Sequence, residues 1–89
     1  MKAIVTVVGR DRVGIIARVC TLLAARGVNV LDINQTLLQE FFTMVMLVDT
    51  GACSVSFDVL RAELKALGGE MGLSVHIQSE EIFNAMYKV

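Results

Sequence analysis

Apolar and polar residues repeat with two different periods along the chain, and the changes of period predict where strands give way to helices. Residues 2–8 form a β-branched run, which predicts a strand. Residues 14–26 carry apolar side chains at helical spacing, which predicts a helix. Residues 28–38 and 41–48 look extended on either side of Gln39-Glu40, so we expect them to form a β-hairpin.

The second half of the chain predicts another helix and strand, followed by a short third helix. Ser54 or Ser56 is placed to cap a helix whose apolar stripe ends at Gly68-Gly69. Residues 73–78 alternate between apolar and polar, which predicts a strand with one dry and one wet face. Residues 79–89 predict a helix too short to be stable alone, so we expect it to dock on its own sheet or on a partner's. Its apolar side chains are Ile82, Phe83, Met86 and Val89.

The element order βαββαβ predicts one α+β domain over residues 1–89. Two right-handed βαβ units joined by a hairpin give a ferredoxin-like sandwich, a four-stranded antiparallel sheet with both helices on one face. The first and third strands are expected in the centre and the other two at the edges. Both faces of the central strands are apolar, whereas the helices cover one face. We therefore expect the other face to meet a second subunit, another segment such as the C-terminal helix, or water at some cost, and the protein to be at least a dimer.

Composition narrows the range of partners. Hydrophobic residues make up 55% of the 89 residues, which predicts apolar surface available for self-association. The formal net charge of −1 gives no electrostatic basis for binding nucleic acid or an anionic membrane. The two cysteines lack C-x-x-C spacing and His76 has no neighbouring ligand, so no metal or cofactor is expected. The absence of a signal peptide pattern and of a long apolar span favours a cytoplasmic protein.

The stretch 9–16 is the candidate site, because it places two glycines around three charges immediately before a helix. The free amides of Gly14, Ile15 and Ile16 at the helix start suit a carboxylate, and Gly14 would keep the approach open. Alternatively, Gly14 relieves a tight contact between helix and sheet. Asp11 either caps the helix or accepts a hydrogen bond from a ligand ammonium.

Three segments resemble the motifs of the ACT domain, and the match spans the whole chain. Residues 11–15 (DRVGI) resemble the D-R-P-G-I segment at the start of its first helix, with Val13 in place of the usual proline. Residues 27–30 (GVNV) resemble the following G-x-N-I. Residues 32–35 and 42–44 are similar to the hairpin of amino-acid-sensing ACT modules. Together with the helix start, the resemblance gives as candidate ligand-binding residues Asp11, Arg12, Val13, Gly14, Ile15, Ile16, Asn29, Asp32 and Asn34.

The resemblance implies a non-catalytic regulatory module of the small bacterial and archaeal ACT proteins. Such a module binds an amino acid or a similar small carboxylate at a subunit interface and passes its occupancy to a regulated protein. Two alternatives remain open, a structural interaction module without a ligand and an acylphosphatase-like hydrolase. The hydrolase would use Arg10 or Arg12 with Asn29 or Asn34, but the G-x-V-Q-G-V spacing of that family is missing.

Overall fold

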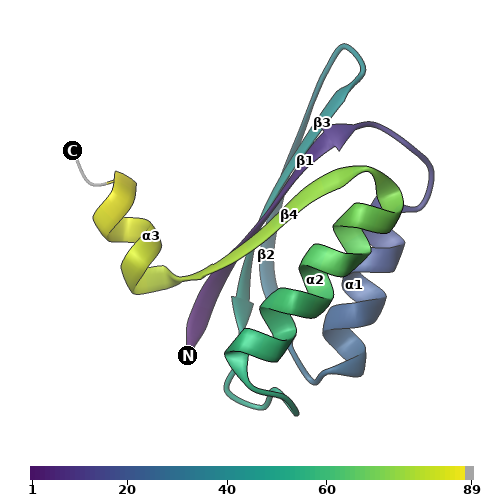
Figure 1. The fold of residues 1–89 in the computed structure, drawn as a ribbon. Coiled ribbons are helices and arrows are strands. Elements are labelled where there is room, and N and C mark those ends of the chain that lie inside the picture. The colour runs from purple at the N-terminus through teal and green to yellow at the C-terminus, as the bar shows by residue number, and fades with distance from the viewer. Residues whose placement is uncertain (88–89) are drawn as a thin grey trace.

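A four-stranded antiparallel sheet forms one layer of the computed structural model, and two helices form the other (Figure 1). The structure describes residues 1–87, without the side chains of Phe83, Met86 and Tyr87. In chain order the elements are β1 (Lys2–Arg10), α1 (Ile15–Ala25), β2 (Asn29–Leu38), β3 (Phe41–Asp49), α2 (Phe57–Met71), β4 (Leu73–Ser79) and α3 (Glu80–Tyr87). This order confirms the predicted ferredoxin-like sandwich with its additional C-terminal helix.

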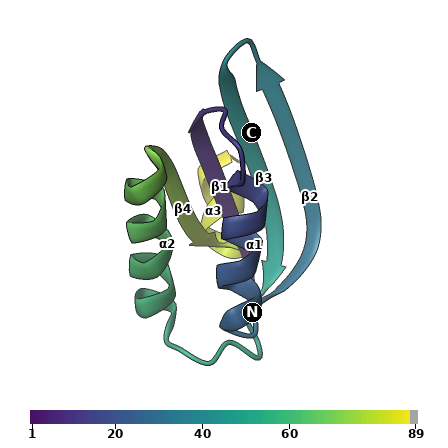
Figure 2. The same ribbon diagram turned by 90° about the vertical axis from the view of Figure 1, so that its right-hand side faces the viewer.

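The strands follow the spatial order β2-β3-β1-β4, so β1 and β3 are central as predicted (Figure 2). Directly paired residues share a face of the sheet. Val5, Met46 and Ile77 pair across the three strands β1, β3 and β4 and are buried beneath the helices. The opposite face, which we call the open face, has its centre on β1 and β3. This centre consists of Ile4, Thr6, Val8, Thr43, Val45 and Leu47.

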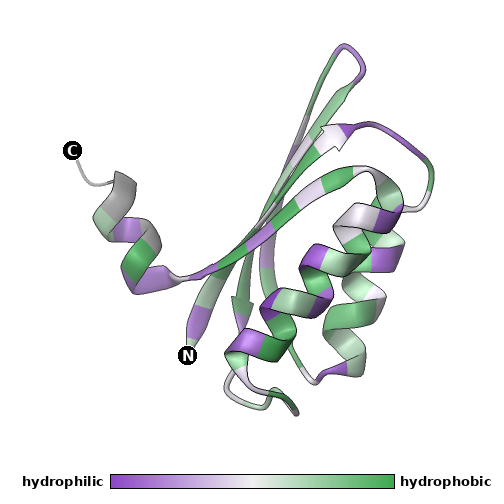
Figure 3. Ribbon diagram, in the orientation of Figure 1, coloured by the Kyte–Doolittle hydropathy of each residue, from purple (hydrophilic) through white to green (hydrophobic). Residues whose placement is uncertain are grey.

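The core lies between the helices and the covered face of the sheet, and it is entirely apolar within the described residues. Leu23 of α1, Leu60 and Leu64 of α2 and Met44 and Met46 of β3 are among its fully buried side chains. Figure 3 shows the matching alternation along β4, where hydrophobic and hydrophilic residues take turns. Leu73, Val75 and Ile77 of β4 therefore enter the core, and Ser74, His76 and Gln78 lie on the open face.

Helix α2 runs past the point where the sequence predicts its end. The prediction that it stops at Gly68-Gly69 is wrong, since the helix continues to Met71 and is closed by Gly72. Gly68 serves packing instead, because a Cβ at this position would lie 2.7 Å from the Leu73 carbonyl oxygen. At the other end Ser56 is the capping residue, and its hydroxyl accepts a hydrogen bond from the Val59 amide at 3.2 Å.

Strand β1 is two residues longer than predicted and carries the following loop up to the hairpin tip. Gly9 and Arg10 remain paired with Phe42 and Phe41 of β3, so the predicted end at residue 8 is too early. The Asp11 amide then donates to the Glu40 carbonyl at 2.7 Å. This contact holds the start of the loop against the β2–β3 turn.

Strand β2 is an exposed edge with a β-bulge near its start. The register with β3 shifts between Val30 and Asp32, so Leu31 is the extra residue. Val30 pairs with Val48 on the covered side, whereas Asp32 pairs with Leu47 on the open face. Every residue of β2 from Leu31 onward is exposed, because the helices do not extend over this edge (Figure 2).

Helix α3 lies on the side of the sheet opposite α1 and α2 (Figures 1 and 2). It is capped by Ser79, whose hydroxyl accepts a hydrogen bond from the Ile82 amide at 3.2 Å. Ile82 is 55% exposed. The predicted apolar contacts of Phe83, Met86 and Val89 lie outside the described side chains.

The Asp49 carboxylate gives the fold a pH dependence that can be measured. A hydrogen bond of 2.9 Å from the Gly51 amide holds the pKa of Asp49 below its ordinary value, with a smaller effect from the Met1 amino group 3.6 Å away. A lowered folded-state pKa adds stability above the ordinary aspartate pKa of about 4, and this contribution is lost as the pH falls through the lowered value. Asp49→Asn should therefore destabilise the protein in urea at neutral pH, and the difference from wild type should shrink on acidification. A difference that stays constant with pH would contradict the assignment.

Candidate functional site

The N-terminus of α1 is left without a side-chain cap. Gly14 is the N-cap residue, and its carbonyl accepts the first helical hydrogen bond from the Arg18 amide at 2.9 Å. No side chain caps this end, so the interpretation of Asp11 as a helix cap is wrong. The amides of Ile15, Ile16 and Ala17 have no carbonyl to bond within the helix. They carry the positive end of the helix dipole and are available to an anion.

The three residues that carry these amides border a hollow of about 260 Å³. Its lining residues are Asp11, Arg12, Gly14, Ile15, Ile16, Ala17 and Phe42. Five of them are among the candidates from the sequence, while Ala17 and Phe42 are not. Ala17 carries the third free amide of the helix, which the length of the first turn could have indicated. Phe42 arrives from β3 through the sheet register, and nothing local in the sequence indicates this.

The space beside Gly14 is open. The backbone φ of Gly14 is +89°, a value that residues other than glycine rarely adopt. A Cβ at this position would have no atom within 4 Å. The alternative that Gly14 relieves a tight contact between helix and sheet is therefore wrong. The neighbouring Val13 is 99% exposed and does not line the hollow, although it is a candidate from the sequence.

Arg12 connects the loop to the far end of α2. Its guanidinium donates from Nη1 to the Met71 carbonyl at 2.8 Å, while the residue as a whole remains exposed. The last carbonyls of a helix attract cations, which favours this contact. The bond fixes the loop and places a positive charge at the border of the hollow.

The three candidates from β2 lie away from this hollow in the single chain. Asn29 pairs with Asp49, which is seven residues along β3 from Phe42, or about 24 Å at the usual strand rise. Asp32 and Asn34 lie on the open face of the sheet, and the Asp32 carboxylate accepts a hydrogen bond from the Ile33 amide at 2.9 Å. One chain therefore does not bring these residues to the helix start.

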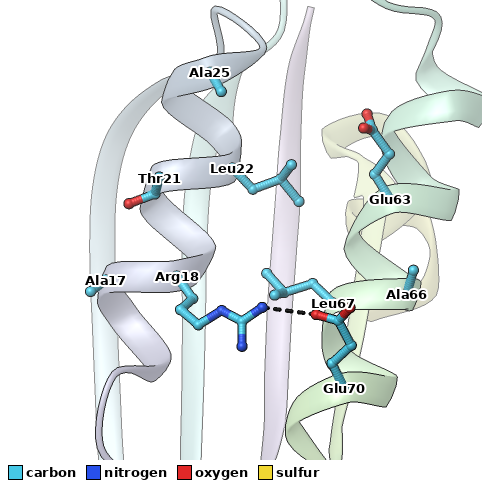
Figure 4. A pocket seen from close by; sticks show the side chains of 9 residues that line it. All are labelled: Ala17, Arg18, Thr21, Leu22, Ala25, Glu63, Ala66, Leu67 and Glu70. Carbon is cyan, nitrogen blue, oxygen red and sulfur yellow. Dashed lines mark hydrogen bonds and ion pairs between the residues drawn. The ribbon is translucent and has the colours of Figure 1, made fainter.

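A larger groove of about 590 Å³ runs between α1 and α2 on the outside of the helix layer (Figure 4). Leu22 and Leu67 point toward each other across it. Its charged side chains are engaged in ion pairs, Arg18 with Glu70 at 2.8 Å and Arg26 with Glu63. The lining offers small and apolar groups together with charges that already have partners. The helix start, by contrast, offers unpaired donors.

Residues 1–87 give little support for metal binding, for hydrolysis or for a membrane-spanning helix. No group of three His, Cys, Asp or Glu side chains in this part of the chain is placed to hold a metal ion. His76 is exposed, and its Nε2 lies 2.7 Å from the Ser74 hydroxyl, as expected for a solvated histidine. Arg12 is not brought together with Asn29 or Asn34, the combination that a hydrolase would need. None of the helices within these residues is long and apolar enough to cross a membrane.

The fold and the helix start define a ferredoxin-like domain with an uncapped helix N-terminus beside a hollow at its first helix. The model of the ACT domain family matches residues 2–78, and the chain belongs to this family. ACT domains are regulatory modules that bind small molecules.

Individual relatives agree with this assignment. The chain is 53% identical to a UPF0237 protein of Clostridium acetobutylicum over 89 residues, which is 100% of each chain. An ACT domain protein from Streptococcus pneumoniae has a similar structure, with a TM-score of 0.82, 46% identity and 98% of each chain covered. A putative glycine cleavage system transcriptional repressor matches with a TM-score of 0.74 and 26% identity, over 86% of this chain and 44% of that one.

Proposed function

We propose that this protein is a non-catalytic sensor that binds an amino acid or a similar small carboxylate at the N-terminus of α1. The observation that carries the proposal is the uncapped turn, where the amides of Ile15, Ile16 and Ala17 face a hollow with nothing over Gly14. A carboxylate would accept these hydrogen bonds and would be stabilised by the helix dipole.

The remaining lining of the hollow suits the rest of an amino acid. The carboxylate of Asp11 lies at the border and is an acceptor for the ligand ammonium. Phe42 and Ile16 offer apolar surface for a side chain, and Arg12 adds positive charge toward the ligand carboxylate. The hollow has a volume of about 260 Å³. About nine molecules of liquid water occupy the same volume, which is enough space for a small amino acid.

A second chain paired along β2 would place this site near a subunit interface. β2 is an edge strand with one unpaired side, and its Leu31, Ile33 and Leu37 are 43%, 40% and 57% exposed. An edge of this kind readily pairs with another chain. Asn29, Asp32 and Asn34 would then contribute to binding from the interface rather than from the hollow of their own chain. Such an edge-paired dimer, coupled to a regulated protein, is the assembly that we propose for signalling.

Gly14→Asn is expected to abolish or strongly reduce amino-acid binding. Asparagine tolerates a positive φ better than most residues, so the fold should survive while the new side chain fills the approach to the amides. Loss of one charge-assisted hydrogen bond costs about 1.5–3 kcal/mol, which corresponds to a loss of affinity of about tenfold or more. Asp11→Ala should also weaken binding of amino acids but should leave binding of simple carboxylates such as acetate nearly unchanged. Calorimetric titration with a panel of amino acids and small carboxylates measures both effects.

Gly72→Asn is the matched control. Gly72 also has a positive φ, of +69°, and open space around a Cβ, but it does not line the hollow. It should therefore carry a similar backbone strain without any change in affinity. Wild-type protein that binds no member of the panel would overturn the sensor proposal. Undiminished binding by Gly14→Asn would show that the helix start is not the site.

A further inference from the structure

The open face of the sheet has the composition of a protein interface. The central residues Ile4, Val8, Val45 and Leu47, with two threonines between them, carry no charge. Val8 is 42% exposed and the others are half-buried. Charged groups occur only toward the margins, such as Lys2 and Asp49 at one end of the central strands and Arg10 at the other. A centre without charges inside a charged rim is typical of protein–protein contacts.

The chain's own C-terminal helix lies against β1 and β4 at one end of this face. A hollow lined in part by Met1, Lys2 and Asn84 lies between it and the start of β1. Val8 and Thr43 lie toward the opposite end of the strands. Ile82 on α3 is itself 55% exposed. The apolar centre of the face and the exposed Ile82 of α3 therefore lie on the same side of the molecule, opposite α1 and α2 (Figure 1).

The total exposed surface is also large for the size of the chain. It amounts to 5585 Å² for a mass of 9.7 kDa. Monomeric proteins of this mass expose about 5,100 Å² on average. The excess agrees with a protomer that covers part of its surface by association.

The sheet order makes the open face complementary to itself. Its four strands run β2-β3-β1-β4, so a two-fold axis parallel to the strands and between β3 and β1 exchanges these two strands and places β2 opposite β4. The apolar centre of one chain then meets the apolar centre of the other. Asn34 and Thr36 of β2 come opposite His76 and Ser74 of β4, which pairs polar rows with polar rows. A second copy of this chain is thus a chemically suitable occupant.

We infer that two copies of this protein stack their open faces about this axis, with α3 of each copy adding contact at the edge of the interface. The interface is separate from the β2 edge and from the helix start, so it does not rest on the proposed ligand.

The size of the face explains why α3 is needed. Four strands at about 4.8 Å spacing and seven residues of length make a surface of about 19 by 24 Å, or about 450 Å² per chain. The pair of faces contributes about 900 Å², slightly below the roughly 1,000 Å² that specific interfaces exceed. The exposed side of α3 supplies the remainder.

Val8→Lys is expected to halve the mass of the assembly, measured by light scattering on the chromatographed full chain at micromolar concentration. It places a charge at the uncharged centre of the interface, where desolvation opposes association. Because this face is the contact that joins the two chains, the mass should fall from two chains to one. Thr43→Lys, directly opposite Val8 on β3, should have the same effect. Deletion of residues 82–89 should raise the dissociation constant by about tenfold or more, because α3 completes the buried area.

Val59→Lys is the control, because Val59 is 46% exposed on α2 and receives the same substitution on the other layer of the molecule. Its assembly should equal that of wild type, and circular dichroism should show that all the lysine variants are folded. A monomeric wild type, or folded Val8→Lys and Thr43→Lys variants with unchanged mass, would overturn the inference. Unchanged association after the deletion would remove α3 from the interface.

Discussion

Gly68→Ala and Gly69→Ala should shift the melting temperature in opposite directions, although the two glycines are neighbours in the same helix. A Cβ at Gly68 would lie 2.7 Å from the Leu73 carbonyl oxygen and 2.9 Å from Val75 Cγ2, and a backbone atom cannot easily move away. Overpacking of this kind costs about 1–3 kcal/mol and opposes a helix-propensity gain of about 1 kcal/mol; a net loss of about 1 kcal/mol lowers Tm by roughly 4–8 °C in a domain of this size. A Cβ at Gly69 meets no atom within 4 Å, and alanine is favoured over glycine in a helix by about 1 kcal/mol.

Differential scanning calorimetry of the two variants beside wild type measures both effects. Because each substitution adds one methyl group to the same turn of α2, the helix propensity gain is shared and the difference reports the contact with β4. Equal shifts for both variants would mean that α2 lies farther from β4 than the structure places it.

Leu64→Ala is expected to destabilise the protein strongly. Leu64 is 0% exposed between α2 and the sheet, so its removal leaves a cavity and costs about 3–5 kcal/mol. Leu67→Ala, three residues further along, removes the same atoms from a half-buried side chain that lines the groove between α1 and α2. The groove is open to water, and the expected cost there is about 1–2 kcal/mol.

Urea unfolding followed by circular dichroism gives the free energy of unfolding for both leucine variants. The comparison is matched in residue type, helix and helix propensity, so only burial differs. A Leu67→Ala variant as unstable as Leu64→Ala would show that the groove is closed in solution, for example by a partner chain.

The fold follows closely from sequence patterns because each element has its own period. Alternation in residues 73–78 and the apolar stripe of α2 are enough to identify the strand, the helix and the side that each of them buries. The ends of the elements depend on contacts distant in sequence. Gly68 looks like a helix end, but it lies inside α2 because Leu73 and Val75 need the space.

The candidate site was only partly predictable for a similar reason. The free amides and Asp11 belong to one local stretch, so its glycine and its charges indicate them directly. Phe42 enters through the pairing of β3 with β1, and Arg12 is held by a carbonyl 59 residues away in the chain. No local pattern encodes either contact.

The bulge at Leu31 determines which face of the sheet each later residue of β2 occupies. Without it, Val30 would be followed on the covered side by Asp32, Asn34 and Thr36; with it, that side receives Ile33, Gln35 and Leu37. One added residue thus decides which side chains of β2 lie on the covered face and which lie on the open face, because side chains alternate between the two faces along a strand. Deleting a single residue from β2 would exchange these two sets without altering any other side chain of the strand. Both proposed contacts between chains, along the edge and across the open face, inherit their chemistry from this one insertion.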